Sequence, residues 1–91
     1  MSVDRPKVLL VDDEENIRFL VGSALSAQDL DVTSVDNGAD ALKRLRAEPI
    51  DIVVLDINLP DIDGFEILRR LRADGWAGPV LFLTARGATD D

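Results

Sequence analysis

Strand-like apolar runs recur along this chain of 91 residues, and their pattern constrains the fold more than any other feature. The runs at 7–12, 50–55 and 80–83 are almost continuously apolar, whereas 31–35 alternates. Continuous runs of this length are typical of strands that are buried on both faces, because a strand with one solvated face alternates. The sequence therefore predicts four short strands in a sheet that helices cover on both sides.

The segments between the runs have helical spacing. We expect helices at 15–27, 37–47 and 64–73, with Asn37 as an N-cap and Pro49 as a stop. The apolar face of the first is expected to comprise Ile17, Leu20, Val21, Ala24 and Leu25. The order β-α-β-α-β-α-β predicts an α/β fold, a doubly wound parallel sheet with right-handed crossovers.

Carboxylates stand where two of the continuous runs end. Asp12 ends the first run and Asp13 follows it, and Asp56 follows the run at 50–55. If these strands are parallel neighbours, the three acids converge at the carboxyl edge of the sheet, where open α/β sheets bind ligands. Because three close carboxylates repel one another, we expect a divalent cation to join them and one acid to remain available for chemistry.

The amino-acid composition limits which metals and which partners the chain is expected to bind. The chain has no cysteine and no histidine, so a metal must be held by oxygen, which favours Mg²⁺, with Mn²⁺ or Ca²⁺ as substitutes. A net charge of −8 argues against nucleic-acid binding by this segment. No apolar stretch is long enough to span a membrane, and residues 1–6 lack a secretory signal, so we expect a cytoplasmic location.

Three motifs stand out in the sequence, VLLVDDE at 8–14, VVLDINLPDIDG at 53–64 and VLFLTA at 80–85. Together they resemble the receiver domain of two-component response regulators, and the resemblance extends from Lys7 to the end of the chain. It implies a flavodoxin-like sheet with strand order 2-1-3-4. The stretch after 67 is also similar to regulators whose effector half is a winged-helix DNA-binding domain.

The resemblance implies a role for each matching residue. Asp56 would take a phosphoryl group from a phosphohistidine of a sensor histidine kinase. Thr84 matches the hydroxyl that bonds a phosphoryl oxygen and serves in switching, and the Ala85 amide would bond another oxygen. The domain would be a switch without a turnover substrate, not an enzyme.

The metal ligands follow from the same resemblance. Asp13, Asp56 and the backbone carbonyl of Asn58 would ligate Mg²⁺, and Asp12 would hold it through water. Mg²⁺ keeps several waters and takes one or two carboxylates, which suits this small set of acids.

The chain also departs from the family pattern, which continues with a fourth helix, a fifth strand and a fifth helix. That strand carries a lysine that pairs with the phosphoryl group, and neither Lys7 nor Lys43 matches it. We therefore expect residues 1–91 to be a single, C-terminally truncated receiver domain. The run at 80–83 would then be an open, apolar sheet edge, which predicts self-association.

Three alternatives remain open at this point. A phosphatase of the haloacid-dehalogenase type also uses a nucleophilic Asp and Mg²⁺, but it needs a second acid two residues later, where this chain has Asn58. A nucleotide or flavin binder would need a glycine-rich loop after the first strand, which is missing. The third is a truncated fragment that no longer signals.

Overall fold

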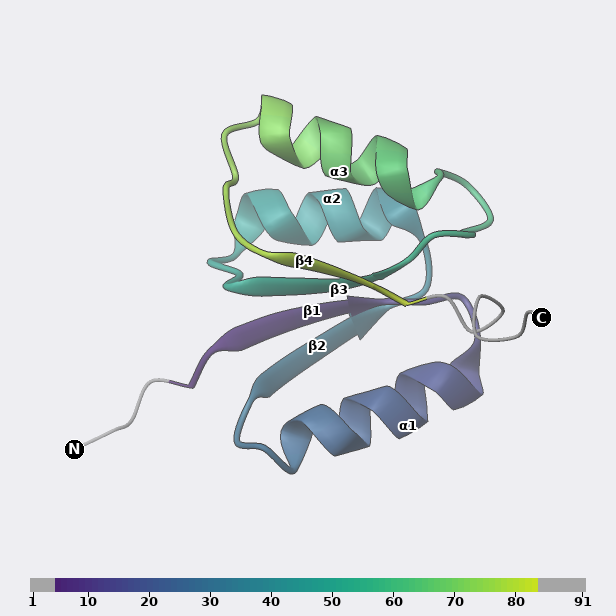
Figure 1. The fold of residues 1–91 in the computed structure, drawn as a ribbon, viewed down its shortest axis with the longest axis vertical. Coiled ribbons are helices and arrows are strands. Elements are labelled where there is room, and N and C mark those ends of the chain that lie inside the picture. Colours follow the sequence, from purple (N-terminus) through teal and green to yellow (C-terminus); the bar gives the residue numbers. More distant parts are fainter. Residues whose placement is uncertain (1–4, 84–91) are drawn as a thin grey trace.

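The computed structural model describes residues 5–83, which form one parallel four-stranded sheet between helices (Figure 1). The sheet order is β2-β1-β3-β4, as predicted. Every neighbouring pair is parallel, so the strand ends that carry the acids lie at the same edge. The strands are β1 (Lys7–Val11), β2 (Asp31–Val35), β3 (Ile52–Asp56) and β4 (Val80–Leu83).

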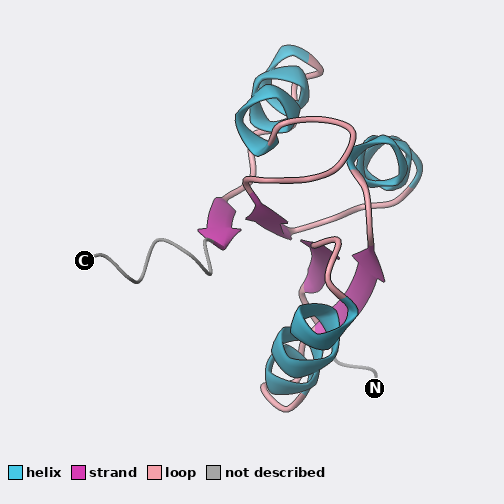
Figure 2. Ribbon diagram, turned by 90° about the vertical axis from the view of Figure 1, so that its right-hand side faces the viewer, coloured by secondary structure: helices cyan, strands magenta, loops and turns pink. Residues whose placement is uncertain are grey.

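Helices cover both faces of the sheet, but unequally. The helices are α1 (Glu15–Ser26), α2 (Gly38–Ala47) and α3 (Gly64–Ala73). Figure 2 shows α2 and α3 together on one face, with α1 on the other. The predicted N-cap of α2 is confirmed, because Asn37 Oδ1 accepts the Asp40 amide at 2.8 Å.

The continuous strands supply two hydrophobic clusters from alternate residues. The larger cluster, on the face of α2 and α3, contains Leu9, Val11, Val53 and Leu55 together with buried helix residues such as Ile67. The smaller cluster, on the face of α1, is built on Val8, Leu10 and Val54. Burial on both faces is the physical reason why β1 and β3 do not alternate.

The predicted apolar face of α1 is partly wrong. Val21 and Leu25 pack against the smaller cluster, but Leu20 is 61% exposed, and Ala24 is exposed as well. The part of α1 that meets the sheet is therefore narrower than the stripe that the sequence pattern indicated, and Leu20 and Ala24 lie outside it. No residue of α1 is fully buried.

Strand β3 begins two residues later than predicted, at Ile52. The Ile50 side chain is still buried, but its carbonyl accepts the indole Nε1–H of Trp76 at 3.1 Å. The Asp51 amide instead donates to the Lys7 carbonyl at 2.8 Å. Ile50 therefore belongs to the turn that leads into the sheet.

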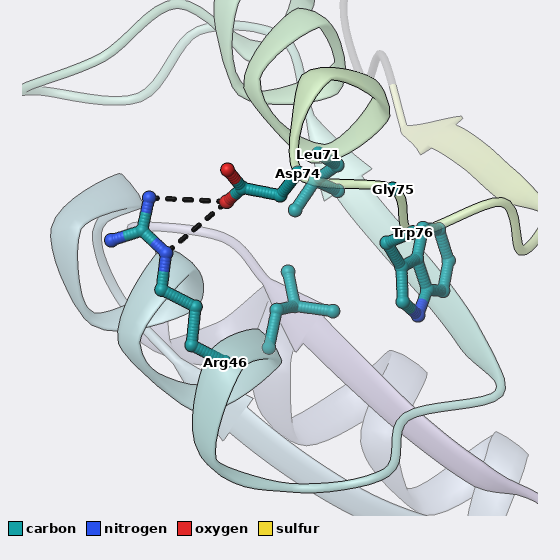
Figure 3. A pocket seen from close by; sticks show the side chains of 6 residues that line it. Arg46, Leu71, Asp74, Gly75 and Trp76 are labelled. Atoms are coloured by element: carbon teal, nitrogen blue, oxygen red, sulfur yellow. Dashed lines mark hydrogen bonds and ion pairs between the residues drawn. The ribbon is translucent and has the colours of Figure 1, made fainter.

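The hollow in Figure 3 lies between the C-terminal ends of α2 and α3, at the amino edge of the sheet. It measures about 480 Å³ and is walled by Leu45, Leu71 and Trp76. An ion pair of 3.1 Å between Arg46 and Asp74 joins the two helices beside it. The three acids singled out from the sequence lie at the opposite edge, so this hollow is separate from them.

Candidate functional site

The structure brings Asp12, Asp13 and Asp56 together at the carboxyl edge of the sheet. Each offers one carboxylate oxygen, and the three oxygens lie within 4.8 Å of one another. The register that pairs Val11 with Leu55 sets the ends of β1 and β3 side by side. Asp12 and Asp13 therefore face Asp56 as a direct result of strand pairing.

Asp12 is the buried member of this acid cluster, with 4% of its surface exposed. Burial raises the pKa of Asp12, and the carboxylates of Asp56, Asp13 and Glu14 raise it further. The Glu14 amide donates to Asp12 Oδ1 at 2.9 Å and opposes this rise in pKa. The ionised cluster is thus an arrangement that a cation would stabilise, because positive charge offsets both the burial and the repulsion.

The donor chemistry of the cluster fits a hard divalent cation. Carboxylate oxygens are the only side-chain donors in the cluster, and Asp13 is exposed while Asp56 is half-buried. Such a set suits Mg²⁺, which retains waters on its open side, better than metals that prefer nitrogen or sulfur.

The loop after Asp56 turns sharply, and Gly64 makes the turn possible. The Asn58 amide donates to Asp56 Oδ1 at 3.3 Å, and the Gly64 amide donates to the Ile57 carbonyl at 2.9 Å. A Cβ at Gly64 would lie 2.8 Å from the Asp56 carbonyl oxygen. The start of α3 is therefore packed directly on the backbone of the residue that ends β3.

Two side chains that the sequence did not single out support this edge. The Arg18 guanidinium reaches from α1 and donates to the Asp12 carbonyl at 2.7 Å. Asp61 accepts the amides of Gly38 and Ala39, at the start of α2, at 2.8 and 2.9 Å. Both contacts join separate elements, and no local sequence signal reports such contacts.

The remaining predicted site residues are placed only in part. Asn58 is exposed in the loop that follows Asp56. Thr84 and Ala85 lie outside the described residues. Their assigned roles stay predictions from the resemblance.

Comparison with known families decides what kind of domain carries this acid cluster. The sequence model of the response regulator receiver domain matches residues 8–91. The chain belongs to this receiver family. Domains of this family are phosphoacceptor signalling modules, and the acid cluster lies within the matched region.

Solved receiver structures share the fold. The chemotaxis response regulator CheY4 of Vibrio cholerae is 30% identical and has a TM-score of 0.87, covering 93% of this chain and 72% of that one. The response regulator TrrA of Thermotoga maritima, solved in complex with Mg²⁺ and BeF, is 33% identical with a TM-score of 0.84. That match covers 91% of this chain and 76% of TrrA.

Curated relatives of this receiver chain are transcriptional regulators. The transcriptional regulatory protein TrcR of Mycobacterium tuberculosis is 46% identical over 85 residues, which are 93% of this chain and 33% of TrcR. The chain thus spans about a third of the length of such relatives. Within residues 5–83, no helix is long and apolar enough to cross a membrane.

Proposed function

We propose that Asp56 is the phosphoacceptor of this receiver domain and that a sensor histidine kinase is its phosphodonor. The observation that carries the proposal is the convergence of Asp12, Asp13 and Asp56 within 4.8 Å in a chain of the receiver family. In this proposal, the aspartyl phosphate changes the state of an effector domain in a longer regulator. The transcriptional relatives support that output.

In the proposed reaction, a carboxylate oxygen of Asp56 attacks the phosphorus of the phosphohistidine. The new O–P bond forms as the P–N bond breaks, and the departing imidazole nitrogen takes a proton from solvent. Asp56 stands at the end of β3, half-buried and held by the Asn58 amide, so its carboxylate is oriented before the donor arrives. Such positioning matters because phosphoryl transfer needs little covalent help from other protein groups.

The acid cluster would hold Mg²⁺. Asp13, Asp56 and the Asn58 carbonyl would be direct ligands, and buried Asp12 would act through water. When bound, the cation offsets the repulsion between a carboxylate nucleophile and an anionic phosphoryl group. The raised pKa of Asp12 and the all-oxygen donor set support this assignment, as does the Mg²⁺ complex of TrrA.

In this proposal, the domain is a signalling switch in the cytoplasm. It takes one phosphoryl group per chain and is not a turnover enzyme. Thr84 and Ala85 would bind phosphoryl oxygens. A net charge of −8 supports the view that this segment does not bind nucleic acid by itself.

Intact-mass measurement tests the phosphoacceptor. The chain is incubated with Mg²⁺ and acetyl phosphate, and we expect one hydroxylamine-labile phosphoryl addition in the wild type and none in Asp56→Asn. Asp74→Asn, at the opposite edge of the sheet, is the matched control and should be modified normally. Continuous release of phosphate would indicate a hydrolase instead, and no modification would indicate an inert fragment.

We also propose that the 91-residue chain self-associates through β4. Within residues 5–83, no strand pairs with the outer edge of β4, and Leu81 in this strand is 60% exposed. An apolar open edge favours pairing with a second copy. Sedimentation should show a dimer or larger species for the wild type, and Leu81→Lys should reduce it. A stable monomer at high concentration contradicts this part of the proposal.

A further inference from the structure

A single carboxylate joins the loop after β3 to the start of α2. Asp61 Oδ1 accepts the Gly38 amide at 2.8 Å and the Ile62 amide at 2.9 Å, and Oδ2 accepts the Ala39 amide at 2.9 Å. Gly38 and Asp61 are 23 residues apart in sequence. The Asp61 carboxylate is therefore a clamp between two distant segments, the loop after β3 and the start of α2. It also accepts an amide of its own loop.

The clamp is well matched to the helix end that it binds. The first amides of a helix have no partner within the helix, and the N-terminal end favours negative charge. Asn37 satisfies the Asp40 amide, and Asp61 satisfies the two before it. The Gly38 amide, followed by the other backbone donors, lowers the pKa of Asp61, so the clamp is ionised at neutral pH.

The clamp holds the outer part of the loop that contains Asn58. At its base, the loop is closed by the bond from the Gly64 amide to the Ile57 carbonyl. Toward its tip, Asp61 holds it against α2, with Leu59 and Ile62 packed on the larger hydrophobic cluster. The segment between the two attachments includes Asn58, so its backbone is tied at both ends.

The contact with α2 is also closely fitted. A Cβ at Gly38 would lie 2.9 Å from Ile67 Cδ1, 3.0 Å from Ile62 Cβ and 3.3 Å from Asp61 Oδ1. The absence of a side chain at Gly38 is what lets the loop approach the helix amides. Displacing either partner therefore changes the path of the loop.

We propose that Asp61 is a positioning residue, which holds the loop against α2 so that Asp56 and the Asn58 carbonyl are in place before the cation and the phosphodonor arrive. The inference rests on the proposed function, because it assigns the loop a part in binding Mg²⁺. Asp61 does not touch the reacting atoms. It acts through the backbone, as residues that orient metal ligands do.

Asp63 offers a matched control in the same loop. Its Oδ1 accepts the Phe65 amide at 2.7 Å, so it caps α3, the helix that it immediately precedes. In the described part of the chain, its side chain bonds to no distant element. Asp61→Asn and Asp63→Asn remove the same charge and weaken the same kind of bond. Only the first loosens the link between the loop and α2.

The experiment measures Mg²⁺ affinity by calorimetry and phosphorylation by acetyl phosphate in both variants of the full chain. We expect Asp61→Asn to bind Mg²⁺ roughly tenfold more weakly, while Asp63→Asn stays close to wild type. Amide exchange at Gly38 and Ala39 should quicken only in Asp61→Asn. Gly38→Ala, which displaces the loop from the other side, should weaken Mg²⁺ binding as well, and it serves if Asp61→Asn does not fold.

The outcomes separate the two proposals. Wild-type affinity in Asp61→Asn, or equal losses in the Asp61 and Asp63 variants, overturns the positioning role and leaves the phosphoacceptor intact. A wild-type chain that neither binds Mg²⁺ nor becomes phosphorylated overturns both.

Discussion

Gly64→Ala is expected to disturb the backbone at Asp56, the proposed phosphoacceptor. The new Cβ would lie 2.8 Å from the Asp56 carbonyl oxygen and 2.9 Å from Ile57 Cα, whereas ordinary contact begins at 3.4 Å. Both neighbours are backbone atoms, so no flexible side chain can move aside. Among the described glycines only Gly75 has a positive φ, so the requirement at Gly64 is for space rather than for conformation.

The expected size of the effect follows from this geometry. Overpacking of a tight contact typically costs about 1–3 kcal/mol in the free energy of unfolding. A displacement of about 1 Å at a reacting group can cost about a hundredfold in rate, so the smaller shift needed here should slow phosphorylation roughly tenfold. Stability and rate should fall together, because one clash causes both changes.

The assay compares initial rates of modification by acetyl phosphate, with urea unfolding followed by the fluorescence of Trp76, the single tryptophan. Gly22→Ala is the control, because its Cβ would lie 3.7 Å from Leu10 Cδ2, in ordinary contact. Alanine should stabilise helix α1 there by about 1 kcal/mol and leave phosphorylation unchanged. Wild-type rate and stability in Gly64→Ala refute the reasoning.

Three further predictions concern charge and hydrogen bonding. Asp12→Asn should raise the free energy of unfolding in EDTA and weaken Mg²⁺ binding, because it removes a buried charge beside Asp56. Chemical denaturation with and without Mg²⁺ measures both effects. The pKa of Asp61 in the folded chain lies below its ordinary value of 3.8. The ionised Asp61 carboxylate therefore contributes fully to stability above pH 3.8, and this contribution is lost as the pH falls through the lower pKa of the folded state. The difference in unfolding free energy between wild type and Asp61→Asn should therefore shrink in acid, and a constant difference argues against the clamp. Trp76→Phe should cost about 1 kcal/mol in urea unfolding followed by circular dichroism, because the Ile50 carbonyl loses its indole donor.

The fold could be predicted from the sequence because burial leaves a local record. Strands covered on both faces have no polar alternation, and β1 and β3 show this directly. The start of α2 could also be predicted, because Asn37 stands where a cap is needed. The exposed face of α1 was not readable, because the width of its contact depends on how the helix lies on the sheet.

For the candidate site, the sequence predicts the cluster of acids but not the side chains that support it. Asp12, Asp13 and Asp56 could be grouped because parallel strands bring their carboxyl ends to one edge. The contacts of Arg18 and Asp61 could not, because each depends on the tertiary path of a neighbouring element. Sequence patterns thus indicate the groups that do the chemistry more readily than those that hold them in place.

The central position of β1 also links function to the order of folding. Asp12 and Asp13 leave the ribosome more than 40 residues before Asp56, and the two halves of the acid cluster meet only when β3 pairs with β1. A slip of one residue between these strands would send the β3 side chains to the opposite face of the sheet and separate the acids. Cation affinity during refolding would therefore report the moment at which the two strands reach their native register.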